Sequence, residues 1–394
     1  MPKLGLEQLP LAGRRVFLRA DLNAPLADGA VADDTRLRAV LPTLRHTLEA
    51  GAAVVLASHL GRPPGRPDPR YSLAPVADRL AHLLGRPVPL APDCVGPETE
   101  ARARALAPGD LLLLENLRFH AEEEKNDEGF ARALAALADC YVNDAFAAAH
   151  RAHASIAAIT RFLQPAAAGF LMQQELQALG RILQSPERPL VAVLGGAKVS
   201  DKLALVESLV ARVDVLLVGG GMAFTFLRAL GHAVGRSLVE ADRVETARSA
   251  LERARQRGVQ VGLPVDVVVA DGPDSPAGRA VGVREIPDGQ MGLDIGQGTV
   301  AQFAAALKGA GTIIWNGPMG VFEKAPFAAG TLAVARAVAG GRAFSVVGGG
   351  DTIAAVNAAG VGDRIGYIST AGGAFLEFLE GRRLPGVEAL TEAP

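Results

Sequence analysis

Short apolar runs alternate with longer amphipathic stretches along this whole chain, and no other feature restricts its possible folds as strongly. The runs are rich in leucine and β-branched residues, and each ends in a polar or glycine-rich cluster that an amphipathic stretch follows. This alternation is typical of βα units, in which helices cover strands that are buried in parallel sheets. The sequence therefore predicts an α/β fold.

The expected strands and helices follow from this alternation. The strands of the first half are Val16–Ala20, Ala53–Ser58, Asp110–Glu115 and Ala138–Asn143. Those of the second half are Leu190–Leu194, Val213–Val218, Val267–Ala270, Gly311–Trp315, Ala343–Val347 and Arg364–Ile368. Helical periodicity marks Asp34–Glu49, Ser200–Ala211, Glu240–Arg257 and Val300–Lys308. Asp34 and Ser200 are expected N-caps, because their side-chain oxygens can accept hydrogen bonds from free backbone N–H groups.

The length of the chain predicts more than one domain. At 394 residues, 49% of them hydrophobic, it exceeds what one hydrophobic core usually supports. A boundary is expected between about Gln164 and Pro189, where a proline, a glycine and a helical stretch separate two halves with different turns. We expect an N-terminal domain over 1–168, a hinge over 169–186 with a helix from about Leu171 to Gln184, a C-terminal domain over 187–370, and a segment over 371–394 that returns to the N-terminal domain.

Charge and cysteine content limit the compartment and the partners. Lys plus Arg number 40 and Asp plus Glu number 42, which gives a formal net charge of −2 and argues against binding of nucleic acid or an anionic membrane. Charges interrupt every apolar run well before the roughly 18 residues of a membrane span, so neither membrane insertion nor export is expected. Cys94 and Cys140 are expected to be small buried core residues in a reducing cytoplasm.

Basic side chains follow the expected strands of the first half. In parallel α/β sheets, ligands bind at the carboxyl ends of the strands, and guanidinium groups pair there with phosphate or carboxylate oxygens. The residues at these ends are Asp21, Asn23, His59, Arg62, Arg118, His120, His150, Arg151 and His153. Together they predict a site for a small polyanion. Taken alone, each arginine would also suit a solvated loop, and each of the last three histidines could have a purely structural role. His46, His82 and His232 are expected at the surface.

Glycine-rich turns follow the expected strands of the second half. The turns are Gly195–Lys198, Gly219–Met222, Gly317–Gly320, Gly348–Thr352 and Ala371–Ala374. Glycine lets the backbone approach a ligand closely, and the N-termini of the helices that follow offer free N–H groups to phosphates. These turns predict a nucleotide site, but none of them has the spacing of a P-loop or of the three-glycine dinucleotide fingerprint.

Charged residues beside the turns refine this prediction. Lys198 and Lys202 lie four residues apart, so a helix that begins near Ser200 would let both point toward the same part of the site. Asp351 is suited to hold Mg²⁺, with nucleotide phosphates supplying further oxygen ligands. The structural alternative is that Asp351 and Thr352 cap a helix.

Seven segments carry a resemblance to a known family. They are Arg19–Pro25, Ser58–Pro63, Tyr141–Phe146, His150–His153, Gly195–Lys202, Trp315–Glu323 and Gly348–Thr352. They closely resemble the signatures of phosphoglycerate kinases, in order and across essentially the whole chain. The resemblance implies two Rossmann-like domains with a hinge helix and a cleft between them, a monomer, and closure of the domains during catalysis. It also implies Mg-dependent, reversible phosphoryl transfer in glycolysis, from 1,3-bisphosphoglycerate to ADP, giving 3-phosphoglycerate and ATP.

The same resemblance implies roles for individual residues. Those for catalysis are Arg36, Lys198, Lys202, Gly350 and Gly373. Those for the glycerate substrate are Asp21, Asn23, Arg36, His59, Arg62, Arg118 and Arg151, with His59 and the last three arginines nearest the 3-phosphate. Those for the nucleotide are Lys202, Gly292, Glu323, Gly349, Gly350, Asp351 and Thr352, with Glu323 on the ribose and Asp351 as the metal ligand.

Two other functions are compatible with a doubly wound α/β chain. A nicotinamide-dependent oxidoreductase would need the missing dinucleotide fingerprint and a less basic partner site. A non-catalytic phosphometabolite-binding protein would have no need for Arg36, Lys202 and Asp351 together. A kinase uses these charges, because its transition state spreads negative charge over three oxygens and needs positioning and neutralisation more than a general base.

Overall fold

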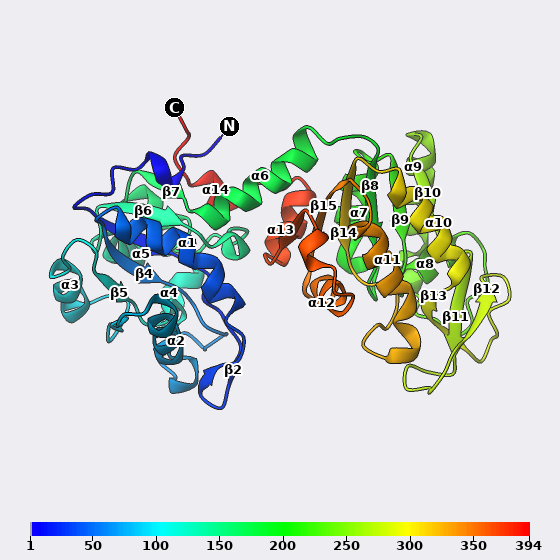
Figure 1. Ribbon diagram of the computed structural model, residues 1–394, viewed down its shortest axis with the longest axis horizontal. Helices are drawn as coiled ribbons and strands as arrows, with labels where there is room; N and C mark the ends of the chain where they lie inside the picture. Colours follow the sequence, from blue (N-terminus) through cyan, green and yellow to red (C-terminus); the bar gives the residue numbers. More distant parts are fainter. Residues whose placement is uncertain (1) are drawn as a thin grey trace. The chain divides into compact units, whose positions relative to one another are not determined.

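The computed structural model describes residues 2–394, which form two compact units. Unit 1 comprises the chain up to Gln177 together with Arg383–Pro394, and unit 2 comprises Ala178–Arg382. Of the segment over 371–394, the last twelve residues therefore belong to unit 1 and the rest to unit 2. Figure 1 shows the parallel strands and covering helices within each unit, which confirms the predicted α/β class.

Unit 1 is built on a sheet of five parallel strands in the order β5-β4-β1-β6-β7. Their bounds are β1 Arg15–Arg19, β4 Ala53–Ala57, β5 Leu111–Leu113, β6 Cys140–Asn143 and β7 Ala166–Ala168. The first four match the predicted strands, with ends that differ by at most two residues. The strand β7 was not predicted, because three alanines carry no periodic signal, yet all three are buried beside β6.

Helices and one hairpin complete unit 1. The hairpin strands are β2 Leu26–Ala27 and β3 Ala30–Val31, and the helices are α1 Thr35–Glu49, α2 Ala74–Leu84, α3 Pro97–Arg104, α4 Ala121–Glu124, α5 Glu128–Ala135 and α14 Pro385–Glu388. The helix α6 (Phe170–Gln184) occupies the expected interdomain stretch, and the division between the units falls within it. Short 3₁₀ helices are Leu6–Gln8, Pro69–Tyr71, Leu117–Phe119, Phe146–Ala148 and Ala158–Arg161.

Asp34 occupies the predicted N-cap position of α1, but neither Asp34 nor Ser200 forms the predicted side-chain cap. The carboxylate of Asp34 accepts hydrogen bonds from Arg38, at 2.7 Å, and from Arg79 instead of from the helix backbone. Ser200 begins a 3₁₀ helix, and its hydroxyl donates to Glu240 at 2.5 Å. At Asp34, guanidinium groups from α1 itself and from α2 take the place of the free N–H groups that a cap would satisfy, and at Ser200 the hydroxyl is the donor to a carboxylate.

Unit 2 contains a sheet of six parallel strands in the order β10-β9-β8-β14-β15-β16. Their bounds are β8 Leu190–Leu194, β9 Val215–Val218, β10 Gln260–Gly262, β14 Thr312–Asn316, β15 Phe344–Gly348 and β16 Tyr367–Ser369. A second sheet, in the order β12-β11-β13, is antiparallel and has the strands β11 Asp266–Ala270, β12 Arg279–Gly282 and β13 Met291–Ile295. The predicted strand Val267–Ala270 therefore exists as part of β11, but its place in a parallel sheet was wrong.

Seven helices pack around these sheets in the described part of unit 2. They are α7 Leu203–Val210, α8 Met222–Ala229, α9 Val244–Gln256, α10 Gln297–Lys308, α11 Ala329–Ala339, α12 Gly350–Ala358 and α13 Gly373–Leu379. The 3₁₀ helices are Ser200–Lys202, Ala241–Arg243, Ala325–Phe327 and Gly362–Arg364. Trp315 is fully buried in the core, where its indole N–H donates to the carbonyl of Gly317 at 2.9 Å. Within residues 2–394, no helix is long and apolar enough to span a membrane.

The strand orders show where each unit can hold a ligand. In unit 1 the chain runs outward from β1 to β4 and β5 on one side and returns through β6 to the other side. In unit 2 the corresponding reversal lies between β8 and β14. A ligand binds at such a reversal, beyond the carboxyl ends of the strands, because the adjacent connections leave in opposite directions there.

Candidate active site

A basic cluster lies at the carboxyl ends of the unit 1 strands. Arg19 ends β1, His59 follows β4, and Arg118, Arg151 and His153 follow β5 and β6. Burial lowers the pKa of His59 well below its usual value, and the charges of these three arginines and of His153 lower it further. The Nη2 atom of Arg19 lies 3.1 Å from Nδ1 of His59, and Arg118 donates to the carbonyl of Gly61, two residues after His59, so side chains from distant parts of the sequence converge on one place.

The acidic and amide groups predicted for this site lie beside α1. Arg36, in the first turn of α1, donates to the carboxylate of Asp21 and keeps about a third of its side chain exposed. The side-chain oxygen of Asn23 accepts from the backbone N–H of Gly61 at 2.8 Å. Arg36 can therefore use its remaining N–H groups for a ligand while Asp21 fixes its direction.

Arg118 and Arg151 are held by neighbouring groups, whereas Arg62 is not. The Nη1 atom of Arg118 donates to the carbonyl of Gly61 at 2.6 Å, and its Nε atom lies 3.1 Å from Glu124. The Nε atom of Arg151 donates to His150 at 3.2 Å. Arg62 is exposed, and in residues 2–394 no hydrogen bond or ion pair involves its side chain. The structure thus brings Arg118 and Arg151 into the cluster but records no contact that brings Arg62 there.

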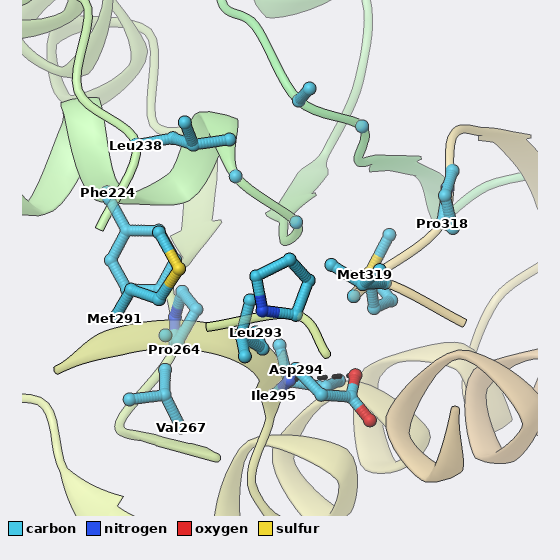
Figure 2. A pocket seen from close by; sticks show the side chains of 18 of the residues that line it. Phe224, Leu238, Pro264, Val267, Met291, Leu293, Asp294, Ile295, Pro318 and Met319 are labelled. Atoms are coloured by element: carbon cyan, nitrogen blue, oxygen red, sulfur yellow. Dashed lines mark hydrogen bonds between the residues drawn. The ribbon is translucent and has the colours of Figure 1, made fainter. Parts of the chain in front are cut away.

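A pocket of about 340 Å³ opens in unit 2, where the glycine turns end the strands. Figure 2 shows apolar side chains such as Phe224, Met291 and Pro264 on one side of the pocket, with Met319 and Pro318 across from them. Its acidic lining residues are Asp294, Glu323 and Asp351. A mostly apolar pocket with a few polar groups, in the size range of small-molecule sites, suits the flat ring of a base with polar groups attached.

The glycine turns pack against one another at the ends of the strands. Gly317 has a φ of +97°, and a Cβ atom there would lie 2.3 Å from the carbonyl oxygen of Gly195. Gly220 has a φ of +66°, and a Cβ atom there would lie 2.6 Å from the backbone nitrogen of Gly196. Only glycine fits these two positions, because each combines a left-handed backbone with a close neighbouring backbone.

Lys202 reaches over the ends of two strands. Its Nζ atom donates to the carbonyl oxygens of Gly195, at 2.5 Å, and Asn316, at 2.9 Å. Burial lowers its pKa to about 8, while the negative charge of Asp351 opposes the shift. Lys198 is exposed and precedes the first helical residue, so the predicted convergence of the two lysines on one helix face is not observed.

The other residues predicted for the nucleotide lie around the same turns. Gly292 and Glu323 line the pocket, as does Asp351, which is exposed in the first turn of α12. The N-cap of α12 is Gly349, so the capping alternative for Asp351 is wrong. Thr352 is buried, and its hydroxyl accepts from the N–H of Gly317 at 2.7 Å, which ties two of the turns together. Other predicted residues of these turns are not among the lining residues of the pocket: Lys202, Gly349, Gly350 at the start of α12, Thr352, and Gly373 at the start of α13.

Sequence reasoning missed Asp294, a buried acid in the wall of the pocket. Its carboxylate accepts from the backbone N–H of Gly330, at 2.7 Å, and of Ile295, at 2.9 Å, the contact drawn in Figure 2. Burial raises its pKa to about 7. The available signal was a charged residue inside the otherwise apolar segment Met291–Ile295.

Replacing Asp294 by asparagine is expected to flatten the pH dependence of stability. The folded-state pKa of about 7 lies above the unfolded value near 3.8, so the folded protein binds more protons between these values. The contribution of this carboxyl group to the free energy of unfolding is fully present below about pH 4. It decreases as the pH rises toward 7, by up to about 1.4 kcal/mol per pH unit. Chemical denaturation of wild type and Asp294→Asn between these pH values checks this, and parallel curves would contradict it.

The remaining histidines and the cysteines have structural surroundings. Only His82 of the three expected surface histidines is exposed, since His46 and His232 are half-buried. Both cysteines are buried and free, as predicted.

Near the first cysteine, Asp93, Cys94 and His120 bring potential ligand atoms within 4.8 Å of one another. His120 pairs with Asp93 at 2.6 Å, the thiol donates to the carbonyl of Glu115 at 2.9 Å, and burial raises the thiol pKa well above its usual value. Each of the three side chains therefore already has a hydrogen-bond partner, Asp93 and His120 in each other and the thiol in the backbone of Glu115.

The chain is similar to phosphoglycerate kinases in sequence and in structure. The family model described as phosphoglycerate kinase matches residues 6–382. The phosphoglycerate kinase of Moorella thermoacetica is 58% identical over 394 residues, which are all of both chains. That of Anaeromyxobacter dehalogenans (strain 2CP-C) is 56% identical over 391 residues, or 98% of this chain and 99% of the relative.

Two solved structures agree with the sequence relatives. The structure of phosphoglycerate kinase from Coxiella burnetii superimposes with a TM-score of 0.92 at 44% identity, and that from Pyrococcus horikoshii OT3 with 0.85 at 37%. Each comparison covers 98% of both chains. Identity at this level along the full length favours a phosphotransferase of glycolysis over the non-catalytic alternative. The chain therefore belongs to the phosphoglycerate kinase family, which its motifs predicted.

Proposed function

We propose that unit 1 binds the phosphoglycerate and unit 2 the magnesium nucleotide, for reversible phosphoryl transfer from 1,3-bisphosphoglycerate to ADP. The products are 3-phosphoglycerate and ATP. The observation that carries this assignment is the basic cluster around buried His59, since its arginines are held at strand ends without enough acidic partners to neutralise them. A cluster of this kind is built for a small polyanion.

The glycerate substrate takes the basic cluster and the polar groups beside α1. Its 3-phosphate is assigned to His59, Arg62, Arg118 and Arg151, and its hydroxyl and carboxyl groups to Asp21, Asn23 and Arg36. The buried position of Arg118 supports this assignment, because a guanidinium that is only 5% exposed forms stronger pairs with an anion than one in water. The exposed Arg62 would join the phosphate only when the ligand is present.

The nucleotide takes the pocket of unit 2. The apolar wall suits the base, Gly292 lies beside it, and Glu323 is assigned to the ribose hydroxyls. The phosphates are assigned to Lys202 and to the turn from Gly349 to Thr352, where α12 begins. Free N–H groups at that helix start and the lysine charge would stabilise them.

Asp351 is the residue that would hold Mg²⁺. Its side chain is exposed, lines the pocket, and in the described residues 2–394 forms no hydrogen bond or ion pair. A free carboxylate beside a phosphate site is the ligand type that Mg²⁺ prefers. When bound, the ion neutralises charge on the phosphate oxygens.

Charge stabilisation is the chemistry assigned to the remaining residues. Arg36, Lys198 and Lys202, with backbone N–H groups at Gly350 and Gly373, would neutralise the transferred phosphoryl group. The attacking oxygen is already an anion, so no general base is needed. The substrates bind to different units, so we propose that the units close around them and exclude water that would hydrolyse the acyl phosphate.

A coupled assay tests the proposed function. ATP-dependent phosphorylation of 3-phosphoglycerate is followed in the reverse direction, through reduction of the acyl phosphate by a dehydrogenase. Turnover that requires both Mg²⁺ and 3-phosphoglycerate is expected. A purified, folded protein that binds both substrates without turnover would support the phosphometabolite-binding alternative instead.

Replacing Arg118 by alanine is expected to weaken binding of 3-phosphoglycerate by about 10-fold or more, which corresponds to the loss of one charge-assisted contact. Titration calorimetry without nucleotide measures this affinity. An affinity within twofold of wild type would contradict the assignment. Arg132→Ala is the matched control, because Arg132 lies on α5 against the ring of Phe162, away from the cluster.

Replacing Asp351 by alanine is expected to raise the Mg²⁺ concentration that gives half-maximal rate by about 10-fold, because the ion loses its only assigned protein ligand. Rates measured against Mg²⁺ at saturating nucleotide check this. Asp363→Ala, at an exposed position after α12, serves as the control. An unchanged Mg²⁺ dependence in Asp351→Ala would remove Asp351 from the metal site.

A cytoplasmic location and a monomeric state are also proposals. Two buried, unpaired cysteines suit a reducing compartment. Light scattering coupled to size-exclusion chromatography decides the oligomeric state, and a mass near 40.7 kDa is expected for a monomer.

A further inference from the structure

Arg19 lies at the centre of a buried hydrogen-bond network that the proposed catalytic roles do not use. It is the last residue of β1, and only 1% of its surface is exposed. Its Nε atom donates to the hydroxyl of Ser155 at 3.0 Å, and its Nη1 atom to the carbonyl of Ala20. Its Nη2 atom lies 3.1 Å from Nδ1 of His59. All three nitrogens of the guanidinium group are therefore engaged inside the protein.

Glu123 supplies the opposite charge behind this arginine. It is in α4 and is also 1% exposed. One carboxylate oxygen accepts from the hydroxyl of Ser155 at 2.6 Å, and the other accepts from the backbone N–H of Ser155 at 2.9 Å. Burial raises the pKa of Glu123, while the charge of Arg19 and the bonds from Ser155 oppose the shift. Ser155 thus connects the buried carboxylate to the guanidinium.

The contact between Arg19 and His59 determines which ring nitrogen carries the proton. A guanidinium group has only donors and stays charged in proteins, so it cannot accept a hydrogen bond. The Nδ1 atom of His59 must then be the acceptor, without a hydrogen. A neutral imidazole has one N–H group, which must be at Nε2.

We propose that Arg19, held by Ser155 and Glu123, fixes His59 as the neutral tautomer with its proton on Nε2, so that His59 serves the phosphate as an uncharged donor. Arg19, Ser155 and Glu123 are positioning residues in this arrangement. The inference deepens the proposed function, because it specifies how one residue assigned to the 3-phosphate is prepared for it.

The other groups that face His59 favour the same state. Arg118, Arg151 and His153 all act on it with positive or potentially positive charge. His153 stays neutral as well, since burial and the arginines lower its pKa to about 3. A second proton on His59 would point an N–H group at the Arg19 N–H and add charge to a cluster that is already positive. The arginines therefore supply the charge, and His59 supplies a directed hydrogen bond.

The tautomer of His59 can be observed without any activity measurement. Long-range ¹H–¹⁵N correlation spectra of the full chain, with ¹⁵N-labelled histidine, distinguish protonated from unprotonated ring nitrogens, and His59→Gln identifies the signal among the seven histidines. From about pH 6 to about pH 8, around the usual pKa of histidine, we expect an unprotonated Nδ1 and a protonated Nε2. A proton on Nδ1, or a doubly protonated ring at neutral pH, would overturn the proposal.

Two variants test whether Arg19 and Ser155 are responsible. Ser155→Ala removes the hydroxyl that joins Glu123 to Arg19, and Arg19→Met removes the donor to Nδ1. Each is expected to give mixed His59 tautomers and to raise KM for 3-phosphoglycerate by about 3- to 10-fold, the loss of roughly one oriented hydrogen bond, with kcat within about twofold. Glu122→Gln, an exposed neighbour in the same helix, is the control and should match wild type.

The outcomes separate this inference from the proposed function. If a folded Ser155→Ala keeps both the wild-type spectrum and the wild-type KM, the positioning role is overturned. If Arg19→Met does not fold, the wild-type and Ser155→Ala spectra still decide the question. If the protein shows no turnover of 3-phosphoglycerate but His59 has the expected tautomer, the function fails while the network stands.

Discussion

Replacing Arg36 by alanine is expected to lower kcat by on the order of 10²-fold or more, with a much smaller change in KM for 3-phosphoglycerate. An interaction that strengthens as charge develops lowers the barrier, whereas one that binds substrate and transition state equally changes only KM. Arg36 is suited to the first role, because Asp21 already fixes its direction before any substrate binds. Its partly exposed guanidinium keeps N–H groups free for the transferred phosphoryl group.

Steady-state kinetics with both substrates near saturation measure this effect. Arg38→Ala is a close control, since Arg38 lies two residues further along α1, is largely exposed and pairs with Asp34. Its kcat is expected to stay within twofold of wild type. An Arg36→Ala enzyme with near-normal kcat and a large increase in KM would make Arg36 a ground-state binding residue.

Replacing Glu123 by alanine is expected to lower the free energy of unfolding by about 3–5 kcal/mol, the usual cost of leaving a buried charge without its counter-charge. The reason is that Arg19 would keep its charge in a place where water does not replace the lost carboxylate. Ser155 would also lose the acceptor of both its hydroxyl and its backbone N–H. The effect should exceed that of most single substitutions.

Chemical denaturation followed by far-ultraviolet circular dichroism measures this loss. Fluorescence is less informative for unit 1, because the single tryptophan, Trp315, is in unit 2. Glu122→Ala is the control, because its side chain is exposed in the same short helix. Glu123→Gln should fall between the two, since glutamine can accept from Ser155 but carries no charge. A Glu123→Ala protein as stable as its control would show that Arg19 does not depend on this carboxylate.

The candidate site was predictable where function requires particular residues at strand ends. His59, Arg118 and Arg151 were identified because each follows an apolar run, and the structure places all three in one basic cluster. Glu123 was not identifiable, since in the run Glu122–Glu124 it looks like part of a solvated helix face. Its burial depends on Ser155, which is 32 residues away in the sequence. A pattern in the local sequence cannot reveal a contact between residues that are so far apart along the chain.

The fold, like the candidate site, was predictable from the sequence in some features and not in others. Burial on both faces makes parallel strands read as continuous apolar runs, so the sequence alone determined the α/β class, most strands to within a few residues, and the family through its motifs. Only the tertiary structure decided that Val267–Ala270 pairs antiparallel, that three alanines form β7, and that Lys202 folds back over Gly195 while Lys198 stays exposed. Periodicity is a property of neighbouring residues, whereas strand partners, burial of charge and the direction of a long side chain depend on what distant segments place beside them.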